Sequence, residues 1–396
     1  MKKLAIILLV LSIGVLDAIS QQAYDIDISG NEGLSRAEEM YRRADYQRLV
    51  KKVLQEDELF VLFYIDVALV IDPTLESQVV EPISTDNPWS SLERFLPGKT
   101  NIYFCPSGSQ LGKAIEYMDC PLDTTILMSD RFGMYRLSSP KELFNNRGDD
   151  FKSKKHKAVV FGGLSYDEET EEEPPSLAFR GGRGSLAHYK NLRWTLDEAL
   201  YIDSLFKKHH IETALLTGPK GTEANFHQIP HQQVDILHVA SHGFYEPFSD
   251  NQEAQTLPDW MLSHSWLLLS GAEHRHSQKE HNGRLTAYEI SKTDLTGVNL
   301  VVLSACETGL GDVKDNDVFG LIKGFKKAGA GTLLVSLSAV SDTVTSLLIT
   351  RFYDNLFRGD NPRRALENAQ RYIRLRSHGQ FNDPKYWATF VLVDDL

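Results

Sequence analysis

The chain has 396 residues, of which 42% are hydrophobic and 24% are charged, a composition typical of a globular protein and not of a disordered one. This length suits two hydrophobic cores better than one. The formal net charge of -12 argues against a nucleic-acid binder, because such proteins use an excess of Lys and Arg to displace counterions from phosphates.

The N-terminal residues have the pattern of a secretory signal peptide. Two lysines precede a short apolar run, and the small residues Ala18 and Ser20 predict cleavage after Ser20. We therefore expect residues 1–20 to be removed and the protein to be exported, either to the periplasm or to the medium. The alternative is an uncleaved N-terminal helix that anchors the protein, although the run is short for a span that stays in the membrane.

The remaining chain is expected to form a leader and a first half. Residues 21–45 are polar and contain one short helical pattern. Residues 46–150 hold apolar runs, and a polar, charged stretch closes this half. The runs that predict strands lie at 59–71, 101–106 and 124–128.

The second half, residues 156–396, alternates apolar runs with amphipathic helices. Thr195 and Glu198 have the spacing of a capping box at the start of the first helix, and Pro362 opens the last one. The six apolar runs lie at 158–163, 214–218, 234–240, 299–305, 332–337 and 389–393. This alternation predicts a mostly parallel six-stranded sheet covered by helices on both faces.

A histidine and a cysteine leave the carboxyl ends of two predicted strands. His242 follows the run at 234–240, and Cys306 follows the run at 299–305. Functional groups gather at this edge of parallel sheets, so neighbouring strands would bring the two side chains together. An imidazole lowers the pKa of a nearby thiol and protonates a leaving group. The backbone N–H groups of Gly243 and Cys306 are candidate donors for an oxyanion hole.

The alternative to a catalytic role for Cys306 is a structural role as a core residue, because a free cysteine after a buried strand is usually buried. The other two cysteines, Cys105 and Cys120, are close enough in sequence to form a disulfide. Two buried free thiols are an equal alternative for them.

Ten of the 13 histidines fall between His209 and His281, and two pairs have a spacing that can bind zinc on a helix. In one pair, His238 and His242 lie on a strand pattern that lacks the HExxH glutamate. In the other, Pro230 separates the two histidines. We therefore expect neither a metal nor a cofactor. We expect His238 to share a strand face with His242 and to be either a packed residue or one that supports His242.

Several segments together resemble the CHAT domains, which are caspase-like modules usually found behind tetratricopeptide repeats. The segments that carry this resemblance include HVASHGFY, NGRLTAYEI and LVVLSACETGLGD. The resemblance implies a caspase-like three-layer α/β/α sandwich, with His242 as general base and Cys306 as nucleophile. It also implies that the first half is a degenerate caspase-like half that supports the second.

The chain departs from the family pattern at several points. We find no repeat pattern ahead of the domain, so we expect the family's usual sensor to be either missing or supplied by a regulatory protein. Members commonly have Trp where this chain has Ser338. Caspases have Gln where it has Ser304, which makes Ser304 a possible specificity residue. Related families hold a basic substrate residue with an acidic side chain. Asp342 is the possible counterpart here, and a helix N-cap is its alternative role.

The function that these patterns favour is a cysteine endopeptidase that hydrolyses a protein or peptide substrate through a thioester. An inactive caspase-like scaffold that binds a protein partner is the alternative from another class. A third possibility is a latent enzyme activated by cuts in the long loops at 164–185 and 244–260. We expect no nucleic-acid partner, and no stable membrane span once the signal peptide is cleaved.

Overall fold

A computed structural model describes most of the chain after residue 43. The described residues are 44–64, 66–107, 110–144, 156–166, 192–246, 261–272, 282–305, 309, 311–314, 317–338, 342–376 and 381–396.

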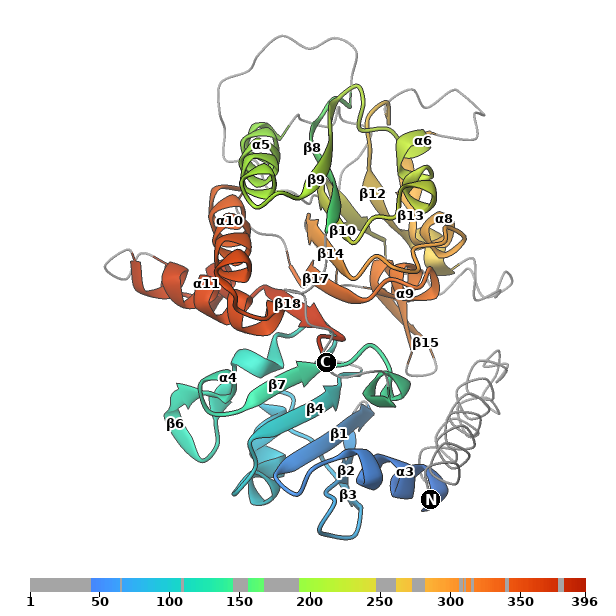
Figure 1. The fold of residues 1–396 in the computed structure, drawn as a ribbon. Coiled ribbons are helices and arrows are strands. Elements are labelled where there is room, and N and C mark those ends of the chain that lie inside the picture. Colours follow the sequence, from blue (N-terminus) through green and yellow to red (C-terminus); the bar gives the residue numbers. More distant parts are fainter. Residues whose placement is uncertain are drawn as a thin grey trace, which may run out of the picture.

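One eleven-stranded sheet runs through the molecule (Figure 1). In spatial order its strands are β3 (Gln78–Val80), β2 (Val67–Ile71), β1 (Glu58–Tyr64), β4 (Asn101–Cys105), β7 (Gly133–Arg136), β18 (Phe390–Val393), β17 (Thr332–Ser336), β14 (Leu300–Ser304), β10 (Ile236–Ala240), β8 (Lys157–Leu164) and β9 (Glu212–Gly218). The six strands expected in the second half all form, and β9, β8, β10, β14 and β17 are mutually parallel. Only β18 runs antiparallel to its neighbour β17, so the mostly parallel sheet is confirmed.

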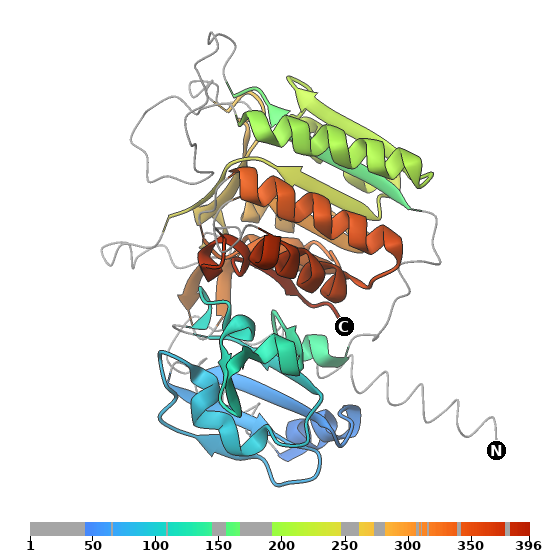
Figure 2. The ribbon, with the colours of Figure 1, turned by 90° about the vertical axis from the view of Figure 1, so that its left-hand side faces the viewer.

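Helices cover both faces of the second half and make it a three-layer α/β/α sandwich (Figures 1 and 2). One face carries α5 (Arg193–Lys208), α10 (Asp342–Arg358), α11 (Pro362–Arg376) and α12 (Pro384–Trp387), and the other carries α6 (Glu223–Phe226), α8 (Ala287–Ser291) and α9 (Leu321–Lys327). Side chains of β10 alternate between the two cores, with Leu237 and Val239 in one and Ile236 in the other. The sheet is therefore buried on both sides, as its continuous apolar runs require.

The first half forms the lower part of the sheet in Figure 1, with α3 (Ala44–Val53) and α4 (Met128–Arg131) beside it. The run at 59–71 is the antiparallel hairpin of β1 and β2. Trp89 packs edge-on against Phe63 and Phe104 with 5.6 Å between ring centroids in each pair, and its Nε1–H donates to the carbonyl of Ile115. Residues 145–155, where the two halves were predicted to divide, lie outside the described residues, so that boundary stays a prediction.

Buried ion pairs occupy the junction between the halves. The last residue of β7, Arg136, pairs with Glu116 through bonds of 2.7 and 2.9 Å. Lys326 of α9 lies 3.1 Å from Asp394 and 3.6 Å from Glu142. Burial alone would lower the pKa of Lys326, but the two carboxylates raise it, so the lysine stays charged between the halves.

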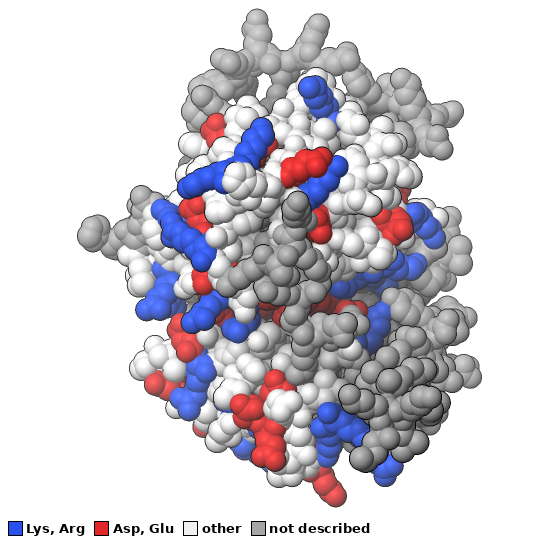
Figure 3. Space-filling view, viewed as in Figure 1, with Lys and Arg blue, Asp and Glu red and all other residues white. Residues whose placement is uncertain are grey.

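Three small sheets complete the fold. The first consists of β11 (Gly243–Tyr245), β12 (Ser265–Leu268) and β13 (Arg284–Thr286), the second of β15 (Gly311–Lys314) and β16 (Asp317–Gly320), and the third of β5 (Asp119–Cys120) and β6 (Asp123–Leu127). On the face drawn in Figure 3, acidic and basic side chains of the described residues are interspersed. The described residues of that face therefore form no single broad basic surface.

The predicted capping box at the start of α5 is wrong. The helix begins at Arg193, and Thr195 instead donates its hydroxyl to the carbonyl of Leu192 and accepts the N–H of Gly163. The helix approaches β8 so closely that a Cβ on Gly162 would come within 2.6 Å of the Thr195 carbonyl oxygen. Glu198 points into the core, where it has a different partner.

Candidate active site

His242 lies two residues beyond the end of β10, at the carboxyl edge of the sheet. Strands β10 and β14 are parallel neighbours, and their register pairs Ala240 with Ser304. Cys306 lies outside the described residues, which stop on this strand at Ala305. Where the chain is next described, the Gly309 N–H donates to the carbonyl of Ser336 at 2.7 Å, at the end of β17.

Aromatic side chains hold the ring of His242. The imidazole lies 5.2 Å from the ring of Tyr166 and 6.0 Å from that of Phe244, and the residue is 8% exposed. Its carbonyl oxygen accepts the Leu268 N–H at 2.9 Å and the Ser241 hydroxyl at 3.0 Å. Both the backbone and the ring of His242 are thus fixed by described neighbours.

Gly243 occupies a special position in the small sheet formed by β11, β12 and β13. The register places it opposite Leu267, while the flanking bonds run from Leu268 N to His242 O and from Glu246 N to His264 O. Hydrogen-bonded and non-hydrogen-bonded pairs alternate in antiparallel sheets, so Gly243 belongs to a non-hydrogen-bonded pair. Its N–H is therefore directed away from β12, beside His242.

The two candidate specificity residues are placed differently. Ser304 is fully buried in β14, in the middle of the sheet. Asp342 is the first residue of α10, and its side chain lies outside the described residues. Ser338 is exposed in the segment between β17 and α10, and its carbonyl accepts the Ser336 hydroxyl. The specificity roles of Ser304 and Asp342 stay predictions.

The sequence did not predict a fully buried polar cluster behind the candidate site. His238 Nε2 lies 3.2 Å from Glu198 Oε1 of α5, an ion-pair distance, although the two atoms are not aligned for a hydrogen bond. On its other side, His238 Nδ1 lies 3.4 Å from the Tyr353 hydroxyl of α10. Burial and the charge of Glu198 raise the pKa of Tyr353 well above its usual value.

His238 is packed, as expected, but its ring does not share the surroundings of the His242 ring. His238 meets Tyr353 of the core beneath α5 and α10, whereas His242 meets Tyr166 of the core on the other face. A glutamate on the apolar stripe of the α5 sequence was the signal that could have revealed the cluster.

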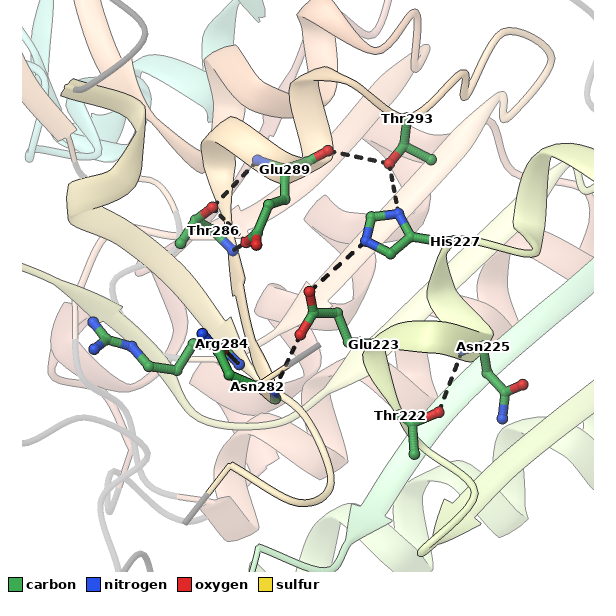
Figure 4. A network of polar contacts seen from close by, with 10 residues as sticks. Thr222, Glu223, Asn225, His227, Asn282, Arg284, Thr286, Glu289 and Thr293 are labelled. Carbon is green, nitrogen blue, oxygen red and sulfur yellow. Dashed lines mark hydrogen bonds and ion pairs between the residues drawn. The ribbon is translucent and has the colours of Figure 1, made fainter. Parts of the chain in front are cut away.

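A second polar network holds the side chain of another histidine, His227 (Figure 4). Glu223 of α6 is buried and accepts the Gly283 N–H at 3.0 Å, next to β13. His227 places Nε2 at 3.8 Å from Glu223 and Nδ1 at 3.1 Å from the Thr293 hydroxyl. These bonds connect α6 to the segments that flank β13 and α8. Within the described residues, no three His, Cys, Asp or Glu side chains are grouped so as to hold a metal ion.

Cys105 and Cys120 are free, buried thiols and do not form a disulfide. They belong to different hydrophobic cores of the first half, so the free-thiol alternative is the correct one. Burial raises the pKa of the Cys105 thiol well above its usual value, and the carboxylates of Asp394 and Glu142 raise it further.

In the part of the chain that the structure describes, no helix combines the length and the apolar character needed to cross a bilayer. Residues 1–43, with the predicted signal peptide, lie outside that part.

Comparison with known proteins gives one family match and several distant likenesses. The sequence profile described as CHAT domain matches residues 94–395. Tetratricopeptide repeat protein 28 of Homo sapiens is 33% identical over 109 residues, which is 28% of this chain and only 4% of the length of that relative.

Two solved structures are similar at low sequence identity. The Arg-specific cysteine proteinase gingipain R has a TM-score of 0.44 and 8% identity, over 78% of this chain and 68% of its own. A complex of the RgpB pro- and mature domains from Porphyromonas gingivalis has a TM-score of 0.38 and 9% identity, over 80% and 71%.

Proposed function

We propose that this chain, which belongs to the CHAT domain family, is a cysteine endopeptidase whose catalytic pair is His242 and Cys306. The observation that carries the proposal is the register of β10 and β14. It pairs Ala240 with Ser304, and each catalytic candidate comes two residues after its member of that pair. Neighbouring strands lie about 4.8 Å apart, which is a suitable starting separation for an imidazole and a thiol.

The reaction follows from the chemistry of these groups. His242 takes the proton of the Cys306 thiol, and the thiolate attacks the carbonyl carbon of the substrate. The negative charge that develops on the carbonyl oxygen is stabilised by the N–H groups of Gly243 and Cys306. The position of Gly243 in a non-hydrogen-bonded pair supports this role, since it leaves the N–H pointing away from β12.

The second part of the reaction releases both products. Protonated His242 gives its proton to the leaving amine, the C–N bond breaks, and a thioester on Cys306 remains. Water, deprotonated by His242, then attacks the thioester and frees the carboxylic acid and the thiol. We propose a protein or peptide as substrate, with Asp342 as the candidate partner of a basic side chain before the cleaved bond.

A scaffold that binds a protein partner is the second candidate, and one observation favours it. His242 and Gly243 are both buried, so the described residues leave little of either accessible to a substrate. A latent enzyme would share this feature. The proposed cleavage sites for its activation, at 164–185 and 244–260, lie largely outside the described residues.

Thiol labelling discriminates between these candidates. Cys306 is expected to react with iodoacetamide at pH 6 at least about tenfold faster than Cys105 or Cys120, because His242 lowers its pKa while the other two thiols are buried. Mass spectrometry of tryptic peptides measures all three rates in one sample. His242→Ala should remove the advantage, and His231→Ala, at an exposed histidine, should not. Equally slow labelling of the three cysteines would support the scaffold.

We also propose that residues 1–20 direct export, on the pattern of two lysines, an apolar run and small residues. N-terminal sequencing of the protein recovered outside the cytoplasm is then expected to begin at Gln21. Recovery of the intact N-terminus in the membrane fraction would instead support the uncleaved anchor.

A further inference from the structure

A row of aromatic side chains extends from His242 across the small sheet. Phe244 of β11 is stacked on Trp266 of β12, with 5.6 Å between ring centroids and 19° between the rings. The guanidinium of Arg284, from β13, lies 4.0 Å from the centroid of Trp266. Phe244 and Trp266 are direct register partners, and Trp266 and Arg284 are diagonal neighbours, so all three lie on one face of this sheet.

Within the row, only its last member, Arg284, is exposed. Phe244 is half-buried, Trp266 is 3% exposed, and Arg284 is exposed. The buried indole fixes the position of the guanidinium, since a cation is attracted to the face of an aromatic ring. Arg284 is therefore a surface charge held in place by the core.

Arg284 has no carboxylate partner within ion-pair distance among the residues that the structure describes. Arg136, Arg351 and Arg363 each have one, at 2.7, 3.8 and 2.9 Å. A protein with a formal net charge of -12 has many acidic side chains that could pair with an exposed arginine. A fixed guanidinium with no carboxylate partner among the described residues suits an external carboxylate, which it can bind through two parallel hydrogen bonds.

The proposed function determines which part of the substrate would lie along the row. His242 protonates the leaving amine, so the substrate residues after the cleaved bond pass on the His242 side of the site. The three steps of the row measure 6.0, 5.6 and 4.0 Å. An extended peptide advances about 3.3 Å per residue, so the row corresponds to roughly two to five substrate residues.

We propose that Arg284, held on Trp266, binds an acidic side chain of the substrate two to five residues after the cleaved bond. This placement rests on the proposed function, because a scaffold has no cleaved bond. The carboxylate-binding site itself does not depend on catalysis. Acidic peptides are thus the ligand class, and Arg284 is the residue that selects them.

Peptide binding to the Cys306→Ala protein tests the site without catalysis. The probes are a ten-residue peptide with Glu at four successive positions and its counterpart with Gln. The Glu peptide is expected to bind at least about tenfold more tightly, since hydrogen bonds between two charged groups are stronger than those to a neutral amide. Adding Arg284→Gln should bring the ratio close to one, and adding Arg284→Lys should leave an intermediate ratio because only the charge is kept.

Arg94→Gln is the matched control, because Arg94 is also exposed and also lies over an aromatic ring, 4.7 Å from the centroid of Phe95. This variant should keep the full ratio. Equal binding of the two peptides, or a ratio unchanged by Arg284→Gln, would overturn the inference. Cleavage of a peptide library by the wild type is a separate readout. If no cleavage depends on Cys306, the proposed function fails, while the binding ratio still decides the role of Arg284.

Discussion

Cys306→Ala is expected to lower kcat/KM for peptide hydrolysis by at least about a thousandfold. Alanine has no nucleophile, so the thioester cannot form, and the remaining oxyanion donors and binding contacts give only residual catalysis. Single-turnover and steady-state assays on a substrate taken from the wild-type cleavage profile would measure the loss. The melting temperature should stay within a few degrees, because one sulfur atom is lost.

His242→Ala should cost about as much as Cys306→Ala, and the double variant should be no worse than either single one. Residues that act as a unit in one chemical step show this non-additive behaviour. Cys120→Ala is the control, because Cys120 is a buried free thiol of the first half, and its activity should stay within about twofold of the wild type. Hydrolysis that persists in Cys306→Ala would refute the mechanism.

Glu198→Ala is expected to lower the free energy of unfolding by about 3–5 kcal/mol, because it leaves His238 buried without its charged partner. Both side chains are fully buried, 3.2 Å apart, between α5 and β10. Urea denaturation followed by circular dichroism would show a lower midpoint with an unchanged slope. Ser204→Ala, at an exposed position of the same helix, should change the free energy by no more than about 0.5 kcal/mol.

The apolar double variant Glu198→Leu/His238→Leu distinguishes a buried charge from lost packing. Removal of both partners leaves no uncompensated charge, and only the Tyr353 hydroxyl loses its contact with His238 Nδ1, so much of the stability lost in Glu198→Ala should return. If the double variant is as unstable as Glu198→Ala, the loss comes from packing and the ion pair makes no special contribution.

The sequence predicted the strands of the second half well, because each is an apolar run bounded by turn residues. Gly329, just after α9, has φ +91°, the left-handed conformation typical of a glycine that ends a helix. The sequence could not predict the partner of Glu198. The spacing between Thr195 and Glu198 fits a capping box as well as a buried position one turn into the helix. Only the packing of α5 on β8 decides between them.

Long-range pairing was also beyond the sequence. The junction of β18 with β7 has one register pair, Val393 with Arg136, and nothing local marks it. Whether Cys105 and Cys120 form a disulfide depended on which hydrophobic core each side chain enters. From the sequence, the ends of β10 and β14 could be expected to be neighbours. The direction of the Gly243 N–H could not be predicted, because it depends on the register of β11 with β12.

The central place of β18 has a consequence for synthesis on the ribosome. The chain emerges from its N-terminus, so β7 and β17 are both present before β18, which alone joins them. Roughly 250 residues separate β7 from β18, and at about 5–20 residues per second they take on the order of ten seconds to a minute to be made. During that time the nascent first half exposes the unpaired edge of β7, a template for aggregation. The yield of soluble protein should therefore depend on translation speed and on chaperones that shield this edge.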